Sequence, residues 1–238
     1  MNKARTAALI LAAGKGTRMH ADTAKQFMEI GGKPLFLYSV ERYLPLVDQV
    51  VLVTNEAGLA FAEKTLSDAG LSERVPVCLG GRERFDSSYR GLCFLTTLGD
   101  FSHVLIHDAA RCLVTEEVIR RVLSDTEEYG AAVASVPLRD TVKVADPDGF
   151  ALSTPDRSTL HVIQTPQGFQ LDLILSAYRR FYEAGSPFVT DDAMVVERFT
   201  DHKVRLSEGD ERNIKVTTAE DIPGVRRILE KEKGTEEC

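Results

Sequence analysis

Residues 9–19 read LILAAGKGTRM, an apolar run that ends in a glycine-rich turn and continues into basic side chains. The turn resembles the fingerprint G-x-G-x-x-G, but Met19 stands where the third glycine belongs. It also resembles a P-loop, but a glycine and not serine or threonine follows the lysine. Gly14 and Gly16 let backbone N–H groups approach an anion. The segment predicts a buried first strand and a loop that binds a strongly anionic group; the alternative is a tight turn with solvated cations. The cations of this region are Lys15, Arg18 and Lys25.

The rest of the chain alternates short apolar runs with longer helical patterns. The expected strands are 7–12, 49–54, 75–79, 102–107, 131–136 and 203–206, and the expected helices are 34–44, 59–69, 83–98, 115–129, 171–182 and 219–233. Thr115 is expected to cap a helix that Gly130 ends. Strands that are apolar on both faces predict an α/β fold with a mostly parallel sheet and helices on both faces. Ligands of such sheets bind beyond the carboxyl ends of the strands, where we expect the first loop, Gly80, Gly81 and Asp108.

The alternation stops at Pro137. Residues 138–163 contain short alternating runs, TVKV and LHVI, around the turn signals PDG and TPD. This pattern predicts an extended, hairpin-like arm that is too short to hold a core of its own. We therefore expect residues 1–238 to form a single domain with an arm at about 138–163.

The composition is that of an ordinary globular protein, since 43% of the 238 residues are hydrophobic and 27% are charged. The formal net charge is −7, whereas proteins that grip long nucleic acid usually carry a basic excess. We therefore expect no nucleic-acid partner, and local cations that suit a small anionic ligand. No apolar stretch reaches the roughly 18 residues of a membrane span, so no membrane partner is expected. The four cysteines form no C-x-x-C pair and the five histidines show no metal-ligand spacing, which favours a reducing cytoplasm and no protein-held metal.

Two polar segments follow predicted strands. In GGRERFDSS, residues 80–88, the glycines allow a flat base to come close, and Ser87 offers a hydroxyl near a helix start; the alternative is a loop with an ordinary helix cap. In HDAARC, Asp108 can accept from hydroxyls or bind a divalent cation, and Arg111 can hold a phosphate with its forked guanidinium. The alternative there is a surface ion pair. His107 is expected to pack or to orient the loop, and not to act as a base.

Three signals near the C-terminal end are weaker. QTPQ and TDDA offer short polar side chains, although TDDA could be only the cap of a short helix. Residues 213–221 are expected to form a short strand that carries Lys215. Thr218 and Asp221 are expected to cap the last helix.

One ordered set of motifs covers most of the chain: AAGKGTRM with AKQF, GGRERFDS, HDAAR, RDTVK, QTPQGF, TDDA and EGDERNIKVTTAED. This set resembles the 2-C-methyl-D-erythritol 4-phosphate cytidylyltransferases of the non-mevalonate isoprenoid pathway. The resemblance implies a Rossmann-like nucleotidyltransferase fold and a homodimer whose extended arms interlock. It also implies that a phosphate oxygen of methylerythritol phosphate attacks the α-phosphorus of CTP, with Mg²⁺ bridging the nucleotide phosphates. Pyrophosphate leaves, and no covalent nucleophile is needed.

The resemblance assigns roles to residues of this chain. Those assigned to cytidine and its triphosphate are Ala12, Ala13, Gly14, Gly81, Arg82, Ser87 and Ala109, with Gly16 in the same loop. Those assigned to charge at the α-phosphate are Arg18 and Lys25, and those that place methylerythritol phosphate for attack are Arg157 and Lys215. Those assigned to the rest of the alcohol-phosphate pocket are Asp108, Arg111, Thr141, Thr165 and Thr190.

The chain departs from the family pattern at three positions. Ala24 and Cys112 stand where proline is usual, and Ser88 replaces a usual apolar residue, but none of these changes removes a charge from the site. A pentitol-phosphate cytidylyltransferase, for example one for ribitol 5-phosphate, would share the CTP half of the site and stays an alternative. A non-catalytic nucleotide-binding protein is a second alternative, although it would be expected to have lost a cation of the site. A dehydrogenase is disfavoured by the missing third glycine.

Overall fold

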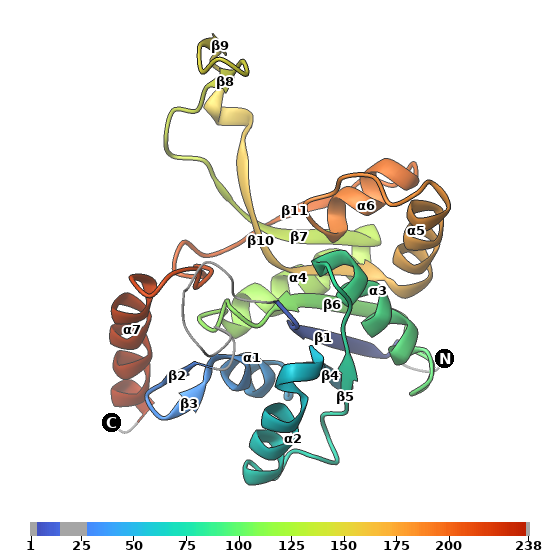
Figure 1. Ribbon diagram of the computed structural model, residues 1–238, viewed down its shortest axis with the longest axis vertical. Helices are drawn as coiled ribbons and strands as arrows, with labels where there is room; N and C mark the ends of the chain where they lie inside the picture. Colours follow the sequence, from blue (N-terminus) through green and yellow to red (C-terminus); the bar gives the residue numbers. More distant parts are fainter. Residues whose placement is uncertain (1–3, 15–27, 237–238) are drawn as a thin grey trace.

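The computed structural model describes residues 4–14 and 28–236, and seven strands of this part of the chain form one central sheet (Figure 1). Their order across the sheet is β11-β7-β10-β6-β1-β4-β5. The bounds are β1 Thr6–Ala12, β4 Gln49–Thr54, β5 Val77–Leu79, β6 His103–Asp108, β7 Ala131–Pro137, β10 His161–Gln170 and β11 Arg205–Glu208. Neighbouring strands are parallel except that β10 is antiparallel to both β6 and β7. The predicted α/β fold with a mostly parallel sheet is confirmed.

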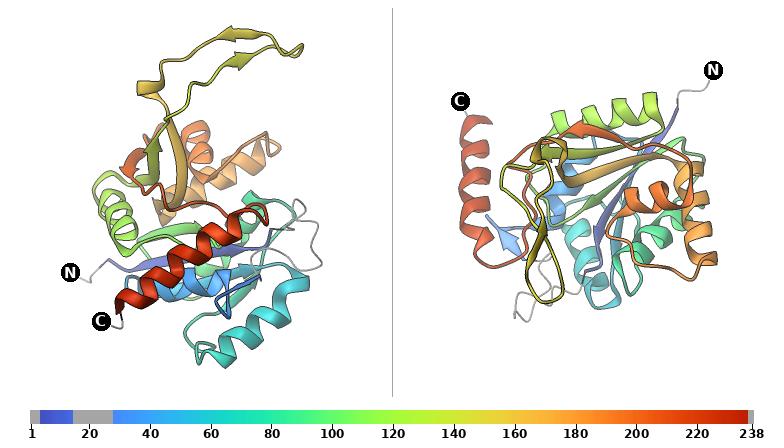
Figure 2. Two further views of the ribbon diagram at one scale, coloured as in Figure 1. Left: turned by 90° about the vertical axis from the view of Figure 1, so that its left-hand side faces the viewer. Right: turned by 90° about the horizontal axis from the view of Figure 1, so that it is seen from above.

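Helices cover both faces of the sheet, as strands that are apolar on both faces require (Figure 2). All of β1 is buried, and successive side chains point to opposite faces. Leu9 belongs to a cluster that includes residues of α3 and α5, whereas Ile10 belongs to a second cluster with residues of α1, α2 and α4. The bounds are α1 Leu35–Tyr43, α2 Leu59–Asp68, α3 Arg84–Leu95, α4 Glu116–Tyr129 and α5 Leu171–Glu183. The sheet is thus the middle layer of a three-layer sandwich.

The ends of α4 lie where the sequence predicts them. The Thr115 side chain accepts a hydrogen bond from the Val118 N–H, and two glutamates in the first turn favour the positive end of the helix. Gly130 ends the helix with a φ of 81°, in the left-handed region that glycine adopts without strain. Among the described residues, no helix is both long enough and apolar enough to cross a membrane.

β10 is a feature that the sequence analysis does not predict. The pattern places residues 161–163 at the end of the arm and leaves QTPQ without a strand, yet His161–Gln170 is one strand between β6 and β7. Its pairing with β7 shifts register between Ile163 and Gln167. Proline and amide side chains are uncommon in a central strand, so the local sequence pattern does not predict β10. The irregular register is where the proline is accommodated.

The side-chain amides that are buried in β10 form hydrogen bonds, which offset the cost of removing them from water. Gln167 Nε2 donates to Asp191 Oδ2 (2.9 Å), and Gln167 Oε1 accepts from the Ala193 N–H (3.1 Å). Gln164 Nε2 donates to the Asp210 carbonyl (2.8 Å). These bonds tie the strand to the start of α6 (Asp192–Phe199) and to the loop after β11.

The start of α6 agrees with the simpler interpretation of TDDA. The Asp191 side chain accepts from the Met194 N–H (2.9 Å), so this residue is the cap of a short helix. The helix extends to Phe199, and the sequence analysis assigns no element to residues 192–199.

The prediction of a strand at residues 213–221 is wrong. The segment is irregular, with a turn bond from the Asn213 N–H to the Asp210 carbonyl (2.9 Å) and a bond from the Val216 N–H to the Ala110 carbonyl (2.8 Å). It crosses the end of the sheet instead of pairing along a strand. Asp221, the first residue of α7 (Asp221–Glu236), accepts from the N–H groups of the two preceding threonines and so fastens the helix start.

The arm leaves the sheet between β7 and β10 and projects away from the layers (Figures 1 and 2). It carries two short antiparallel strands, β8 (Val144–Ala145) and β9 (Ala151–Ser153). Phe150 and Leu152 in this hairpin are 72% and 65% exposed. Apolar side chains exposed on a projecting hairpin mark a surface that another surface can cover.

Gly168 offers a test of how β10 packs on α4. A Cβ placed on Gly168 would lie 2.0 Å from Thr126 Oγ1 and 2.8 Å from Leu105 Cδ2, both in buried residues. We therefore expect Gly168→Ala to lower the free energy of unfolding by about 1–3 kcal/mol in urea denaturation. In a Thr126→Ala background part of this cost should disappear, because the nearest atom has been removed.

The control is Gly224→Ala in α7, where an added Cβ meets no heavy atom within 4 Å. This change should be neutral or stabilise by up to about 1 kcal/mol, because alanine favours helix. A Gly168→Ala variant as stable as the wild type would contradict the close packing of β10 on α4.

Candidate functional site

The carboxyl ends of β1, β5 and β6 lie at one edge of the sheet, as their parallel order requires. The Ala109 N–H, just after β6, donates to the Leu11 carbonyl in β1 (3.0 Å). Asn55 Nδ2, just after β4, donates to the Ala13 carbonyl (3.2 Å). The structure therefore brings together the predicted nucleotide-binding residues that end β1 or follow β1 and β6. These residues are Ala12, Ala13, Gly14 and Ala109.

The loop at Gly80 and Gly81 packs against this edge. A Cβ on Gly80 would lie 2.7 Å from both Ala13 Cβ and Ser87 Oγ, and a Cβ on Gly81 would lie 2.2 Å from Asp86 Cβ. Ser87 is buried, and its Oγ accepts from the Gly81 N–H (3.1 Å) while donating to the Glu83 carbonyl (3.1 Å). The close approach requires glycine at both positions, and Ser87 holds the loop backbone and does not cap the helix.

Asp108 is the centre of the charged part of the site. Arg84 Nε donates to its Oδ1 (3.0 Å) and Lys215 Nζ donates to its Oδ2 (2.6 Å). Burial by itself would raise the pKa of Asp108, but the charges of Arg84 and Lys215 outweigh burial and hold that pKa well below its usual range. The carboxylate of Asp108 therefore stays ionised. Because Asp108 is buried, its ion pairs with Arg84 and Lys215 are not the surface ion pair of the alternative interpretation.

A second carboxylate lies behind Arg84. Asp192, fully buried at the start of α6, accepts from Arg84 Nη1 (2.7 Å) and from the Tyr178 hydroxyl (2.5 Å). Burial would lower the pKa of Arg84, but Asp108 and Asp192 raise it well above its ordinary value. One guanidinium thus pairs with two carboxylates from different elements, and Lys215 supplies the second positive charge.

Arg111 is fixed by backbone oxygens. Its Nη1 donates to the Asn213 carbonyl (2.7 Å) and its Nη2 to the Ile163 carbonyl (3.4 Å). Burial lowers the pKa of Arg111, and the charge of Asp108 opposes this shift. Asn213 itself is buried and donates to the Thr165 carbonyl (2.9 Å). The irregular segment that carries Lys215 is therefore fastened to β10.

His107 and Thr165 complete this buried network. Thr165 Oγ1 accepts from the Asp108 N–H (3.1 Å) and lies 3.0 Å from His107 Nδ1, while His107 Nε2 lies 3.2 Å from the Arg111 carbonyl. Burial lowers the pKa of His107 to about 3. The imidazole is therefore neutral at neutral pH and orients the 108–111 loop, which agrees with the expectation that it is no base.

Other predicted residues lie away from this cluster or outside the described chain. Thr141 and Arg157 are exposed on the arm, where Arg157 Nη1 donates to the Arg139 carbonyl (2.8 Å). Thr190 is exposed just before α6, and Arg82 is exposed in the glycine loop. Gly16, Arg18 and Lys25 lie outside the described residues.

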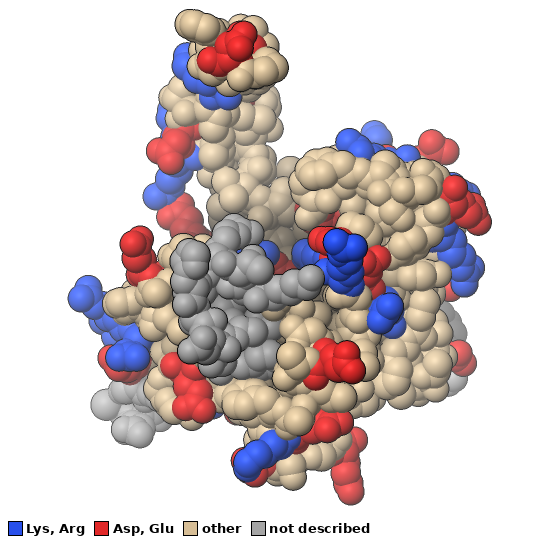
Figure 3. Space-filling model, viewed as in Figure 1, with Lys and Arg blue, Asp and Glu red and all other residues tan. Residues whose placement is uncertain are grey.

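The sequence analysis assigned no role to Arg84 or Asp192. Both lie inside motifs that it singled out, GGRERFDSS and TDDA, and a charged residue in such a motif was the available signal. Their pairing was not visible, because 108 positions separate them along the chain. Figure 3 shows that the basic and acidic side chains of the described residues are interspersed over the face in view.

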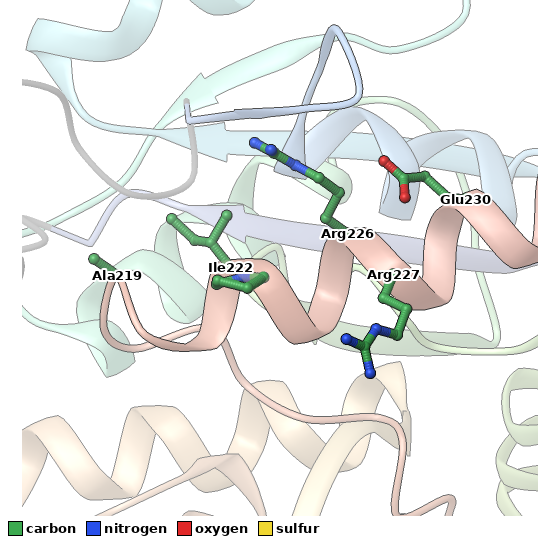
Figure 4. A pocket seen from close by; sticks show the side chains of 6 residues that line it. Ala219, Ile222, Arg226, Arg227 and Glu230 are labelled. Carbon is green, nitrogen blue, oxygen red and sulfur yellow. The ribbon is translucent and has the colours of Figure 1, made fainter.

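The described residues show no metal cluster, and one hollow lies away from this edge. Among the described residues, no group of three histidine, cysteine or acidic side chains is placed to hold a metal ion. A hollow of about 360 Å³ lies along α7, and its walls come from that helix and from Ala219, two positions before the helix begins (Figure 4). It contains none of the predicted site residues. Its walls are Ala219, Ile222, Pro223, Arg226, Arg227 and Glu230.

Comparison with known proteins gives a consistent result. The family model of 2-C-methyl-D-erythritol 4-phosphate cytidylyltransferase matches residues 6–231. The enzyme of that name from Lachnospira eligens is 40% identical over 90% of this chain and 95% of its own, and the one from Caldanaerobacter subterraneus subsp. tengcongensis is 40% identical over 94% and 98%. The structure of 4-diphosphocytidyl-2C-methyl-D-erythritol synthase from Anaerococcus prevotii has a TM-score of 0.82 at 29% identity, covering 95% of this chain and 96% of that one.

The family match spans the whole described sheet and the site at its edge, and the predicted family is confirmed. The chain therefore belongs to the 2-C-methyl-D-erythritol 4-phosphate cytidylyltransferase family, whose members transfer the cytidylyl group of CTP to 2-C-methyl-D-erythritol 4-phosphate.

Proposed function

We propose that this transfer takes place at the edge formed by β1, β5 and β6, and that the predicted site residues act there. The observation that carries the proposal is the 2.6 Å ion pair between Lys215 and Asp108, which joins residues 107 positions apart beside the glycine loop. A cation and a carboxylate from distant segments, held together at the carboxyl edge of a parallel sheet, form the type of place where such folds bind ligands.

The nucleotide half of the proposed site rests on backbone. Gly81, held by Ser87, offers a flat surface for the base, and the end of β1 with Ala13 and Gly14 faces the triphosphate. Arg18 and Lys25 are proposed to stabilise the charge that develops at the α-phosphate. The phosphate oxygen of the acceptor forms the new bond to the α-phosphorus while the bond to the bridging oxygen breaks, and pyrophosphate leaves with that electron pair.

The acceptor half is the charged cluster. Lys215 and Arg111 are proposed to bind the phosphate of methylerythritol phosphate, and Asp108 and Thr190 its hydroxyls. The attacking phosphate oxygen is already anionic at neutral pH, so no general base is required. This agrees with a buried His107 whose pKa lies at about 3. Catalysis then consists of positioning two polyanions and neutralising their charge.

We also propose that Mg²⁺ accompanies CTP. The triphosphate oxygens would hold it, since the described residues include no group of three histidine, cysteine or acidic side chains placed to hold a metal ion. When bound, the ion neutralises charge on the transferring and leaving phosphates.

The arm is proposed to form a homodimer in which each arm completes the partner's site. Its exposed Phe150 and Leu152 suit burial against a second copy, and a twofold axis lets two identical arms cover each other. In this arrangement Arg157 and Thr141 reach the acceptor pocket of the other subunit. A cytoplasmic location is part of the proposal, and it agrees with the absence of disulfides among the cysteines of the described ranges.

The acceptor specificity is tested by pyrophosphate release from CTP. We expect methylerythritol phosphate to support turnover that stops when a chelator removes divalent cations. Ribitol 5-phosphate should give a much lower kcat/KM. A higher kcat/KM with ribitol 5-phosphate would replace the proposed acceptor with the pentitol phosphate.

The two cations of the first loop are expected to act in the transition state. Lys25→Ala and Arg18→Ala should each lower kcat by about 10²–10³, because one preorganised charge is lost, with little change in the thermal midpoint. The control is Lys64→Ala, which removes an exposed lysine paired with Asp68 on α2. Turnover near the wild-type value at saturating substrates would remove the altered residue from the catalytic set.

The shared site is tested by mixing two nearly inactive variants, Arg157→Ala and Lys25→Ala. If each arm serves the partner, a mixed dimer has one site with both changes and one with neither. About half of randomly formed dimers are mixed, so activity should recover toward about a quarter of the wild-type value per chain. Subunit exchange is verified with two affinity tags. No recovery after verified exchange would show that each arm serves its own subunit.

A further inference from the structure

A continuous series of hydrogen bonds leads from α5 to the proposed acceptor pocket. The Tyr178 hydroxyl donates to Asp192 Oδ1, and Arg84 Nη1 donates to Asp192 Oδ2. On the other side of the same guanidinium, Arg84 Nε donates to Asp108 Oδ1, and Lys215 donates to Asp108 Oδ2. Among the described residues, each carboxylate oxygen of Asp108 and Asp192 has one donor, so these contacts fix the order of the groups.

The geometry of Arg84 limits how the groups in this series of contacts can move. The guanidinium is planar, and two of its nitrogens are bonded to carboxylates from two elements, α6 and β6. Asp192 has no exposed surface and a second bond from Tyr178, so it is the fixed end. A guanidinium anchored there presents its Nε–H in one direction, and this direction orients the carboxylate of Asp108.

Lys215 is the movable end. It lies on an irregular segment, its side chain is 37% exposed, and lysine has a flexible four-carbon stem. The bond to Asp108 Oδ2 therefore decides where its ammonium stands. Turning the Asp108 carboxylate would displace that ammonium, and small displacements of a positioning group are costly for reaction rates.

We infer that Arg84 is a positioning residue for the transfer reaction, which anchors Asp108 to the buried Asp192 and thereby places the Lys215 ammonium for the acceptor phosphate. The inference rests on the proposed function, because it assumes that Lys215 and Asp108 face methylerythritol phosphate. It adds a residue that touches neither reacting group and acts through two others.

A purely structural role for Arg84 must be separated from positioning. Removing Arg84 alone would leave Asp192 buried without this cation, and an uncompensated buried charge is strongly destabilising. The double variant Arg84→Met with Asp192→Asn avoids this problem. Asparagine keeps an acceptor for Tyr178, and Asp108 keeps Lys215 but loses its anchor.

In this double variant we expect kcat/KM for methylerythritol phosphate to fall by about 10- to 100-fold, the effect of losing one hydrogen bond to a charged group. The KM for CTP should stay within about twofold, and the thermal midpoint should stay close to the wild-type value. The matched control is Arg120→Met with Glu116→Gln, which removes an exposed arginine–carboxylate pair on α4. All kinetic constants of the control should be those of the wild type.

Arg84→Lys is the second variant, and it keeps a charge near both carboxylates in case the double variant does not fold. One ammonium cannot reproduce the two-point contact, so kcat/KM for the acceptor should still fall while the KM for CTP holds. Wild-type acceptor kinetics in a folded variant would overturn the inference. A rise confined to the KM for CTP would also overturn it, because Arg84 would then shape the nucleotide loop.

Asp108→Asn distinguishes the two levels of the argument. If Asp108→Asn impairs the acceptor kinetics but the Arg84 variants do not, only the positioning role fails. If Asp108→Asn has wild-type acceptor kinetics, the proposed acceptor pocket fails, and the positioning role fails with it.

Discussion

The buried carboxylate of Asp108, with a cation on each oxygen, is the interaction on which the rest of the site depends. Burying a charge is unfavourable unless it is paired and hydrogen-bonded, so Arg84 and Lys215 must both be in place when the chain folds. Arg84 begins α3, and Lys215 lies on the segment before α7. One ionised group at the end of β6 thereby joins three parts of the chain that are far apart in the sequence.

The antiparallel strand β10 supports this arrangement from the other side. It lies between β6 and β7, and it brings Thr165 to the backbone of Asp108 and the Thr165 carbonyl to Asn213. Its polar residues would be unfavourable in an ordinary central strand. Here they provide the hydrogen bonds that hold the loop before α6 and the loop after β11, so the antiparallel strand fastens the segment that carries Lys215.

The same strand pair also determines where the arm begins. β7 and β10 continue past the sheet as the two stems of the hairpin, and Arg139 at its base forms an ion pair with Glu211 in the loop before Lys215 (Figure 1). The base of the arm is therefore connected to the segment that carries Lys215. Arg157 donates to the backbone of Arg139, which keeps both ends of the arm together.

The sequence by itself determined the layers, the family and the identity of most candidate residues. Apolar periodicity, the cap at Thr115 and the glycine at 130 are local signals, and local physics decides helices and buried strands. The order of the motifs placed the candidate residues but gave no contacts. β10 and the irregular path of residues 213–221 were decided by the tertiary structure, because buried amides and a proline are tolerated where distant groups satisfy them. The roles of Arg84 and Asp192 were also decided there, since a buried ion pair exists only when folding brings its partners together.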